Sequence, residues 1–214
     1  MTGKKPTGPH AGQPVLSWGT QVASAKAAMV MVHGRGSSAD DILGLAPELQ
    51  APLLAYLAPQ AAGHTWYPNR FLAPLAHNEP WLSSALSVLE NIEAGLVEAG
   101  IPSEAVFFLG FSQGACLVLE YAARNARRFG GIFGLSGGLI GPDDAPRDSP
   151  GSLAGTPVFM GCSDVDPHIP KERFLESAEV LKRRGASVTA RIYPNMGHMI
   201  NEDEIEAVRS VLSS

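Results

Sequence analysis

The chain has 214 residues, of which 45% are hydrophobic and 17% charged, and this length suits one domain that buries its own core without a metal or disulfide framework. The net charge of −5 and the scattered basic residues disfavour a nucleic-acid-binding protein. The longest apolar run, Ala27–Val32, is far shorter than the roughly 18 residues of a membrane span, and the first twenty residues hold no apolar core of a signal peptide. We therefore expect no stable membrane insertion and a cytoplasmic location.

Along the chain, apolar runs alternate with amphipathic stretches. Residues 1–14, rich in proline and glycine, are expected to form a flexible leader before a single domain at 15–214. The expected strands are Ala28–Val32, Leu53–Ala58, Ala105–Phe111, Gly131–Leu135, Pro157–Gly161 and Val188–Tyr193. The expected helices are Asp40–Leu49, Pro80–Glu98, Gln113–Asn125, Lys171–Arg184 and Asn201–Leu212, with a long surface loop at Gly141–Gly155. This alternation predicts an α/β fold with a mostly parallel central sheet and helices on both faces.

Two segments match the G-x-S-x-G pattern of a nucleophile elbow, in which a serine lies at a sharp turn between a strand and a helix. One is centred on Ser112, within GFSQG at 110–114, and the other on Ser136. Ser112 follows an apolar run and precedes a helical one. Gly141 and Pro142 follow Ser136 so closely that no helix can start there. We predict that Ser112 is the nucleophile and that Ser136 is a structural turn nearby.

A serine hydroxyl reacts readily only when a base removes its proton, and the base needs an orienting carboxylate. Downstream of Ser112 the histidines are His168 and His198, and His198 lies in the loop between the last strand and the last helix. We therefore predict His198 as the base. Asp164 and Asp166 both follow the strand before it, and we favour Asp166 because the next residue is a proline that holds it extended, whereas Asp164 suits a turn.

The oxyanion formed in acyl transfer needs N–H donors close to the nucleophile. We expect one donor to be the backbone N–H of Gln113, directly after the serine. The other is expected to be the backbone N–H of Arg35, in the glycine-containing loop after the first predicted strand. No lysine follows Gly36, so this loop is not a P-loop. The Arg35 side chain could cap the pocket or lie on the surface.

With these residues identified, the chain resembles the phospholipase/carboxylesterase family of α/β-hydrolases, which includes acyl-protein thioesterases and bacterial esterases. The matching segments are HGRG at 33–36, GFSQGA at 110–115, LSGG at 135–138, DVDP at 164–167 and GH at 197–198. The resemblance extends from about Ala28 to Leu212. It implies the α/β-hydrolase fold, a triad of Ser112, Asp166 and His198, oxyanion donors at Arg35 and Gln113, and a loose homodimer.

Several large side chains near these positions are candidates for a substrate-binding wall, although they suit the core equally well. They are Trp66, Tyr67, Phe71, Trp81, Ile169, Met196 and Met199. The segment 64–71 replaces the longer lid and acyl tunnel of the eukaryotic thioesterases in the family, which argues against long-chain lipid substrates. We also expect no metal or other cofactor, because the histidines lack ligand spacing with any carboxylate or cysteine.

The expected function is therefore a serine carboxylesterase acting on small-molecule substrates, namely short-chain acyl or aryl esters. Two alternatives stay open. The first is an acyl-protein thioesterase or lysophospholipase that uses the same triad. The second is a non-catalytic binding protein built on the same α/β-hydrolase scaffold.

Overall fold

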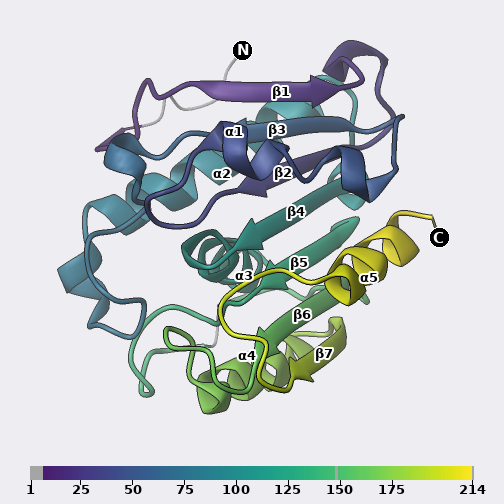
Figure 1. Cartoon of the computed structure of the whole chain (residues 1–214). Helices are drawn as coiled ribbons and strands as arrows, with labels where there is room; N and C mark the ends of the chain where they lie inside the picture. Colours follow the sequence, from purple (N-terminus) through teal and green to yellow (C-terminus); the bar gives the residue numbers. More distant parts are fainter. Residues whose placement is uncertain (1–6, 148, 214) are drawn as a thin grey trace.

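Within the described residues, 7–147 and 149–213, the computed structural model contains one sheet of seven strands in the order β1-β3-β2-β4-β5-β6-β7 (Figure 1). The strands are β1 (Val15–Gly19), β2 (Ala28–Val32), β3 (Ala55–Pro59), β4 (Val106–Phe111), β5 (Gly131–Leu135), β6 (Pro157–Ser163) and β7 (Ser187–Tyr193). β1 runs antiparallel to β3, and the other five pairings are parallel. The predicted α/β fold with a mostly parallel sheet is confirmed.

Helices cover both faces of this sheet. They are α1 (Ala39–Leu43), α2 (Trp81–Glu98), α3 (Gln113–Arg124), α4 (Lys171–Arg183) and α5 (Glu202–Leu212). Short 3₁₀ turns lie at Val22–Ser24, Pro47–Leu49, Ala62–His64, Leu75–Asn78 and Ser103–Ala105. In Figure 1, α1 and α5 lie in front of the sheet, whereas α2, α3 and α4 lie behind it. Among the described helices, none is long and apolar enough to cross a bilayer.

The side chains of each inner strand point alternately to the two faces of the sheet, and each face has its own hydrophobic core. In β2, Met29 and Met31 point to the face that α1 and α5 cover, where they pack with Tyr56 and Phe133. The intervening Val30 and its neighbours pack under α2, α3 and α4. Because successive side chains of a strand point to opposite faces, a strand that is apolar on both faces must be covered on both.

One predicted helix is shorter than expected. We expected a helix over Asp40–Leu49, but the α-helix α1 ends at Leu43. Gly44 caps it, and a separate 3₁₀ turn starts at Pro47. Glycine is a poor helix former and proline lacks the N–H that a continuing helix needs, so the amphipathic pattern alone overestimated the length.

Residues 7–14, expected as part of a flexible leader, pack against the domain. His10 is 2% exposed, and its ring lies 5.3 Å from that of Trp66 and 5.4 Å from that of Trp81. Its Nδ1 accepts the Ala62 N–H at 3.1 Å and its Nε2 donates to the Trp66 carbonyl at 3.0 Å. Burial lowers the pKa of His10, so the neutral ring donates at one nitrogen and accepts at the other. Residues 1–6 lie outside the described residues.

The strand β1 has no counterpart among the predicted strands. All five of its residues are exposed, because β1 is an edge strand that pairs only with β3. Its Trp18 ring lies 5.5 Å from that of Tyr56. Its apolar residues Val15, Leu16 and Trp18 form no run as long as those of the inner strands, and its pairing is made by backbone groups that leave no mark in the sequence.

The N-terminus of α5 carries a buried carboxyl group. The Asn201 side chain accepts the Glu204 N–H at 2.9 Å, and Glu204 Oε2 accepts the Asn201 N–H at 2.9 Å, which together form a capping box. The Glu204 side chain is fully buried, and its Oε1 packs so closely on Gly161 that a Cβ there would lie 2.1 Å from it. Burial raises the pKa of Glu204 to about 7.

This raised pKa predicts a pH-dependent stability. Between about pH 4.5 and 7 the unfolded chain releases the Glu204 proton while the folded chain keeps it, so stability falls as pH rises. The isosteric variant Glu204→Gln keeps a side-chain oxygen that can accept the Asn201 N–H in the capping box, and it has no carboxyl group to titrate. We expect it to raise the unfolding free energy at about pH 8 by about 1–3 kcal/mol and to have little effect at about pH 5. Urea unfolding at both pH values measures this, and an equal effect at both would contradict it.

Candidate active site

Ser112 lies at a strained turn between β4 and α3. Its backbone has φ +56° and ψ −118°, a conformation that L residues rarely adopt. The turn is possible only with glycines around it. A Cβ on Gly110 would lie 2.3 Å from the Gly114 carbonyl oxygen, and one on Gly114 would lie 2.0 Å from the Val32 oxygen. The G-x-S-x-G pattern therefore lifts the Ser112 side chain out of the sheet at the N-terminus of α3.

The second G-x-S-x-G segment forms a different structure. Ser136 also has a positive φ, +55°, and follows β5, but the next described element after it is the strand β6, not a helix. Its side chain is fully buried, and its hydroxyl has no hydrogen-bond partner among the described residues. As expected for a structural turn, Ser136 is withdrawn from the surface that Ser112 reaches.

His198 and Asp166 lie in line with Ser112. His198, in the loop between β7 and α5, places Nε2 2.8 Å from Ser112 Oγ and Nδ1 2.7 Å from Asp166 Oδ2. Asp166 Oδ1 accepts the N–H groups of His168 and Ile169 at 2.8 and 3.0 Å. Burial raises the pKa of Asp166, but the hydrogen bonds from His198 and these two N–H groups outweigh it, so the net pKa is lowered. An ionised Asp166 accepts a hydrogen bond from the N–H at His198 Nδ1, which leaves the unprotonated Nε2 free to accept the Ser112 proton.

Asp164 and His168, the sequence alternatives to Asp166 and His198, do not contact Ser112. Asp164 is exposed, and its Oδ1 accepts the Asn195 N–H at 2.8 Å. Ser163 Oγ similarly accepts the Gly197 N–H at 3.2 Å. Asp164 therefore helps to hold the loop that carries His198. His168 is exposed, and its ring lies 4.8 Å from that of His198 without joining the Asp166–His198–Ser112 chain.

The predicted oxyanion donors lie beside Ser112. Gln113 is the first residue of α3, so its N–H is one of the helix N-terminal donors that have no intrahelical acceptor. The loop that carries Arg35 passes directly beside the elbow, since a Cβ on Gly34 would lie 3.4 Å from Ser112 Cβ. Within the described part of the chain, neither N–H donates to another backbone group. Both are therefore available to a substrate oxygen.

A pocket of about 850 Å³ opens in front of Ser112 and His198. Its lining comprises Gly34, Arg35, Ser37, Tyr67, Pro68, Asn69, Arg70, Phe71, Phe111, Ser112, Gln113, Cys116, Pro167, His168, Ile169 and His198. Three of the predicted wall residues, Tyr67, Phe71 and Ile169, are among them. Sequence reasoning missed Asn69 and Arg70 as wall residues, although they sit in the same segment as the predicted aromatics.

The other four predicted wall residues, Trp66, Trp81, Met196 and Met199, do not line the pocket. Trp66 is fully buried, and its indole N–H donates to the His33 carbonyl at 2.9 Å. Trp81 is partly buried and packs on His10 at the edge of the core. Met196 accepts a hydrogen bond from Asn201 Nδ2, and Met199 is 54% exposed. The tryptophans belong to the core, and the methionines lie close to His198 only along the chain.

The pocket wall is tied to both oxyanion segments. The Gln113 side chain accepts the Trp66 N–H and donates to the Tyr67 carbonyl, both at 2.8 Å. The Arg35 guanidinium donates to the carbonyls of Tyr67, Pro68 and Asn69 at 2.8–2.9 Å. The Arg35 side chain lies at the exposed rim of the pocket, so it both lines the pocket and lies on the surface, the two placements that the sequence left open. These bonds fix segment 66–69 relative to the elbow.

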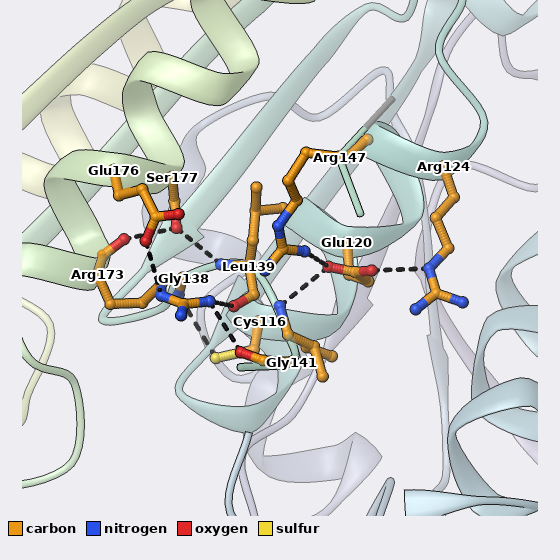
Figure 2. Close-up of polar contacts among 12 residues, drawn as sticks. Cys116, Glu120, Arg124, Gly138, Leu139, Gly141, Arg147, Arg173, Glu176 and Ser177 are labelled. Carbon is orange, nitrogen blue, oxygen red and sulfur yellow. Dashed lines mark hydrogen bonds and ion pairs between the residues drawn. The ribbon is translucent and has the colours of Figure 1, made fainter. Parts of the chain in front are cut away.

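A buried polar network supports the wall from behind (Figure 2). Glu120 of α3 accepts the Ile140 N–H at 2.9 Å and pairs with Arg124 at 2.7 Å and Arg147 at 3.2 Å. Arg173 of α4 donates to the carbonyls of Leu139 and Gly141 at 3.2 and 2.9 Å.

The segment that this network holds reaches the pocket at two points. The Gly141 N–H donates to the Phe71 carbonyl at 2.7 Å, and the Gly138 N–H lies 3.5 Å from Cys116 Sγ. Burial raises the pKa of Cys116 to about 12, so its thiol is not a second nucleophile. The network therefore positions Phe71 and closes the pocket beside Cys116.

Comparison with known proteins agrees with this geometry. The family model described as Phospholipase/Carboxylesterase matches residues 20–214. A solved phospholipase/carboxylesterase from Dyadobacter fermentans DSM 18053 is 42% identical and superposes with a TM-score of 0.93, covering 98% of this chain and 100% of that one.

Two fungal proteins named acyl-protein thioesterase 1 are also similar. The one from Gibberella zeae is 35% identical over 54% of this chain and 50% of its own length, so the match spans half of that relative. The one from Candida albicans is 28% identical over 87% of this chain and 90% of its own length. The chain belongs to the phospholipase/carboxylesterase family of α/β-hydrolases.

Proposed function

We propose that this protein is a serine carboxylesterase that cleaves short-chain acyl or aryl esters through an acyl-enzyme on Ser112. The observation that carries the proposal is the pair of hydrogen bonds at 2.8 and 2.7 Å that connects Ser112, His198 and Asp166. A base within hydrogen-bonding reach of the nucleophile, oriented by a carboxylate, is the arrangement that nucleophilic acyl transfer requires.

The reaction would proceed in two halves. In the first, His198 Nε2 takes the Ser112 proton while the serine oxygen attacks the ester carbonyl, and the N–H groups of Arg35 and Gln113 bind the oxyanion. The N-terminus of α3 adds a favourable dipole there. His198 then gives its proton to the leaving alcohol. In the second half, water attacks the acyl-enzyme as His198 takes its proton. The bond between the acyl carbon and Ser112 Oγ then breaks, His198 returns the proton to Ser112, and the carboxylic acid leaves. Asp166 stabilises the imidazolium in both halves.

A thioesterase with the same residues is the second candidate, because two relatives carry that name. The wall at 66–69 favours short acyl groups, because the bonds from Arg35 and Gln113 fix its position next to Ser112.

A chain-length series tests the proposal. We expect kcat/KM for 4-nitrophenyl esters to be highest between acetyl and hexanoyl and to fall by at least about tenfold from hexanoyl to hexadecanoyl. A longer chain would have to displace the fixed wall at 66–69, and a cost of about 1.4 kcal/mol is a factor of ten in rate. The matching acyl thioesters are measured in parallel. A preference for hexadecanoyl thioesters would favour the thioesterase, and no hydrolysis of any ester or thioester would favour a non-catalytic binding protein.

A further inference from the structure

The charged groups that line the pocket are all basic. They are Arg35 and Arg70, and no carboxylate among the described residues lines it. The chain as a whole has a net charge of −5, so the positive pocket does not reflect the overall composition. A concave site with one sign of charge concentrates ligands of the opposite sign.

Arg35 is held rigidly but is not neutralised. Its three hydrogen bonds go to backbone carbonyls, which carry no net charge, and they use three of the five N–H groups of a guanidinium. Neither Arg35 nor Arg70 forms an ion pair with a carboxylate in the described part of the chain. Six other arginines do: Arg124, Arg127, Arg147, Arg173, Arg191 and Arg209. The two pocket arginines are thus left with charge and donors for a ligand.

The acids nearest the pocket are already engaged. Asp41, on α1, accepts the Ser37 hydroxyl at 2.9 Å and does not line the pocket. Asp166 is fully buried behind His198, whose Nδ1 it binds. Neither carboxylate is paired with Arg35 or Arg70, so the positive charge at this side of the pocket persists.

The topology places these arginines away from the proposed base. Arg35 follows β2 and Arg70 follows β3, which lie on one side of β4 and its Ser112. Asp166 and His198 follow β6 and β7, on the other side of β4. An anionic group bound by the arginines would therefore leave the Ser112–His198 contact free, with the ester carbonyl between the two sides.

We propose that the substrate of this site is an ester that carries a carboxylate, bound by Arg35 and Arg70, an inference that rests on the proposed esterase function. Arginine is suited to this role because its planar donors match the geometry of a carboxylate. The carboxylate belongs either to the acyl part or to the alcohol part of the ester, and the substrates below distinguish the two.

Two matched pairs of esters test the proposal. For the acyl side, 4-nitrophenyl hydrogen glutarate is compared with 4-nitrophenyl methyl glutarate. For the alcohol side, 4-acetoxybenzoate is compared with methyl 4-acetoxybenzoate. We expect the carboxylate ester of at least one pair to have a roughly tenfold higher kcat/KM than its neutral partner. This advantage should shrink at about 0.5 M NaCl, because salt screens charges at an exposed rim.

A variant of Arg70 tests whether the preference for carboxylate esters arises in the pocket. Arg70→Gln is expected to reduce the carboxylate-to-neutral ratio by roughly fivefold or more. The control is Arg183→Gln, which removes an exposed arginine at the end of α4 that does not line the pocket, and which should leave the ratio unchanged. The two variants change the net charge equally, so general electrostatic attraction would affect both alike.

The outcomes separate the inference from the proposed function. Hydrolysis of the neutral esters with no preference for a carboxylate, or a preference that Arg70→Gln leaves intact, overturns the inference and leaves the esterase standing. Failure to hydrolyse any of the four esters, including the neutral ones, counts against the esterase and removes the basis of the inference as well.

Discussion

Replacing Ser112 with alanine is expected to lower kcat for ester hydrolysis roughly 10⁵- to 10⁶-fold. The change removes the nucleophile, and the remaining oxyanion donors cannot form an acyl-enzyme. Stability should change by less than about 0.5 kcal/mol, because Ser112 is only partly buried and His198 is the one partner of its hydroxyl among the described residues. Initial rates with a neutral short-chain ester and a thermal melt of the same samples measure the two effects.

Ser136→Ala is the matched control, because Ser136 is the centre of the second G-x-S-x-G segment. Its buried hydroxyl has no partner among the described residues, so its removal should leave the rate within about twofold of the wild type. An inactive Ser136→Ala together with an active Ser112→Ala would mean that the elbow has been assigned to the wrong serine. A Ser112→Ala that fails to fold would contradict the partly exposed position of this residue.

Glu120→Ala is expected to destabilise the fold by about 3–5 kcal/mol, the largest stability effect that we predict. The Glu120 side chain is 4% exposed, and its removal leaves the Ile140 N–H and the partly buried Arg147 without their acceptor. An unpaired buried charge and an unsatisfied N–H each cost more than the ion pair contributes in the wild type. Urea unfolding at neutral pH measures the change.

Glu179→Ala provides the comparison for this effect. Glu179 pairs with Lys182 on the exposed surface of α4, where the two side chains are 59% and 48% exposed. A pair in solvent contributes little, so the expected loss is below about 0.5 kcal/mol. If Glu120→Ala and Glu179→Ala cost the same, the buried network does not hold the segment behind Phe71 as we describe.

The sequence predicted the chemistry-bearing positions because each depends on local patterns. The glycines around Ser112 leave one possible turn, and the apolar runs before Ser112, Asp166 and His198 are strands of a parallel sheet. The carboxyl ends of neighbouring parallel strands meet at one edge, so these side chains were expected to converge, and they lie within hydrogen-bonding distance. The choice of Asp166 over Asp164 rested on the following proline, and Asp166 is the residue that contacts His198.

Features that depend on contacts far apart in the chain could not be predicted. His10 is buried by partners at Ala62 and Trp66, and nothing in a glycine- and proline-rich leader indicates this. Trp66 was left open between the pocket wall and the core, and its indole N–H donates to the buried His33 carbonyl. Large aromatic side chains suit a pocket wall and a core equally, and only the tertiary structure decides between them. The pairing of Arg35 with the carbonyls of 67–69 is long-range in the same way.

Covalent labelling with a fluorophosphonate, followed by peptide mapping, tests most directly whether position 112 carries an activated hydroxyl. The folded wild-type protein should take up one label per chain on the peptide that contains the elbow after β4. An intact fold that takes up no label, or that carries it on another residue, would contradict the account.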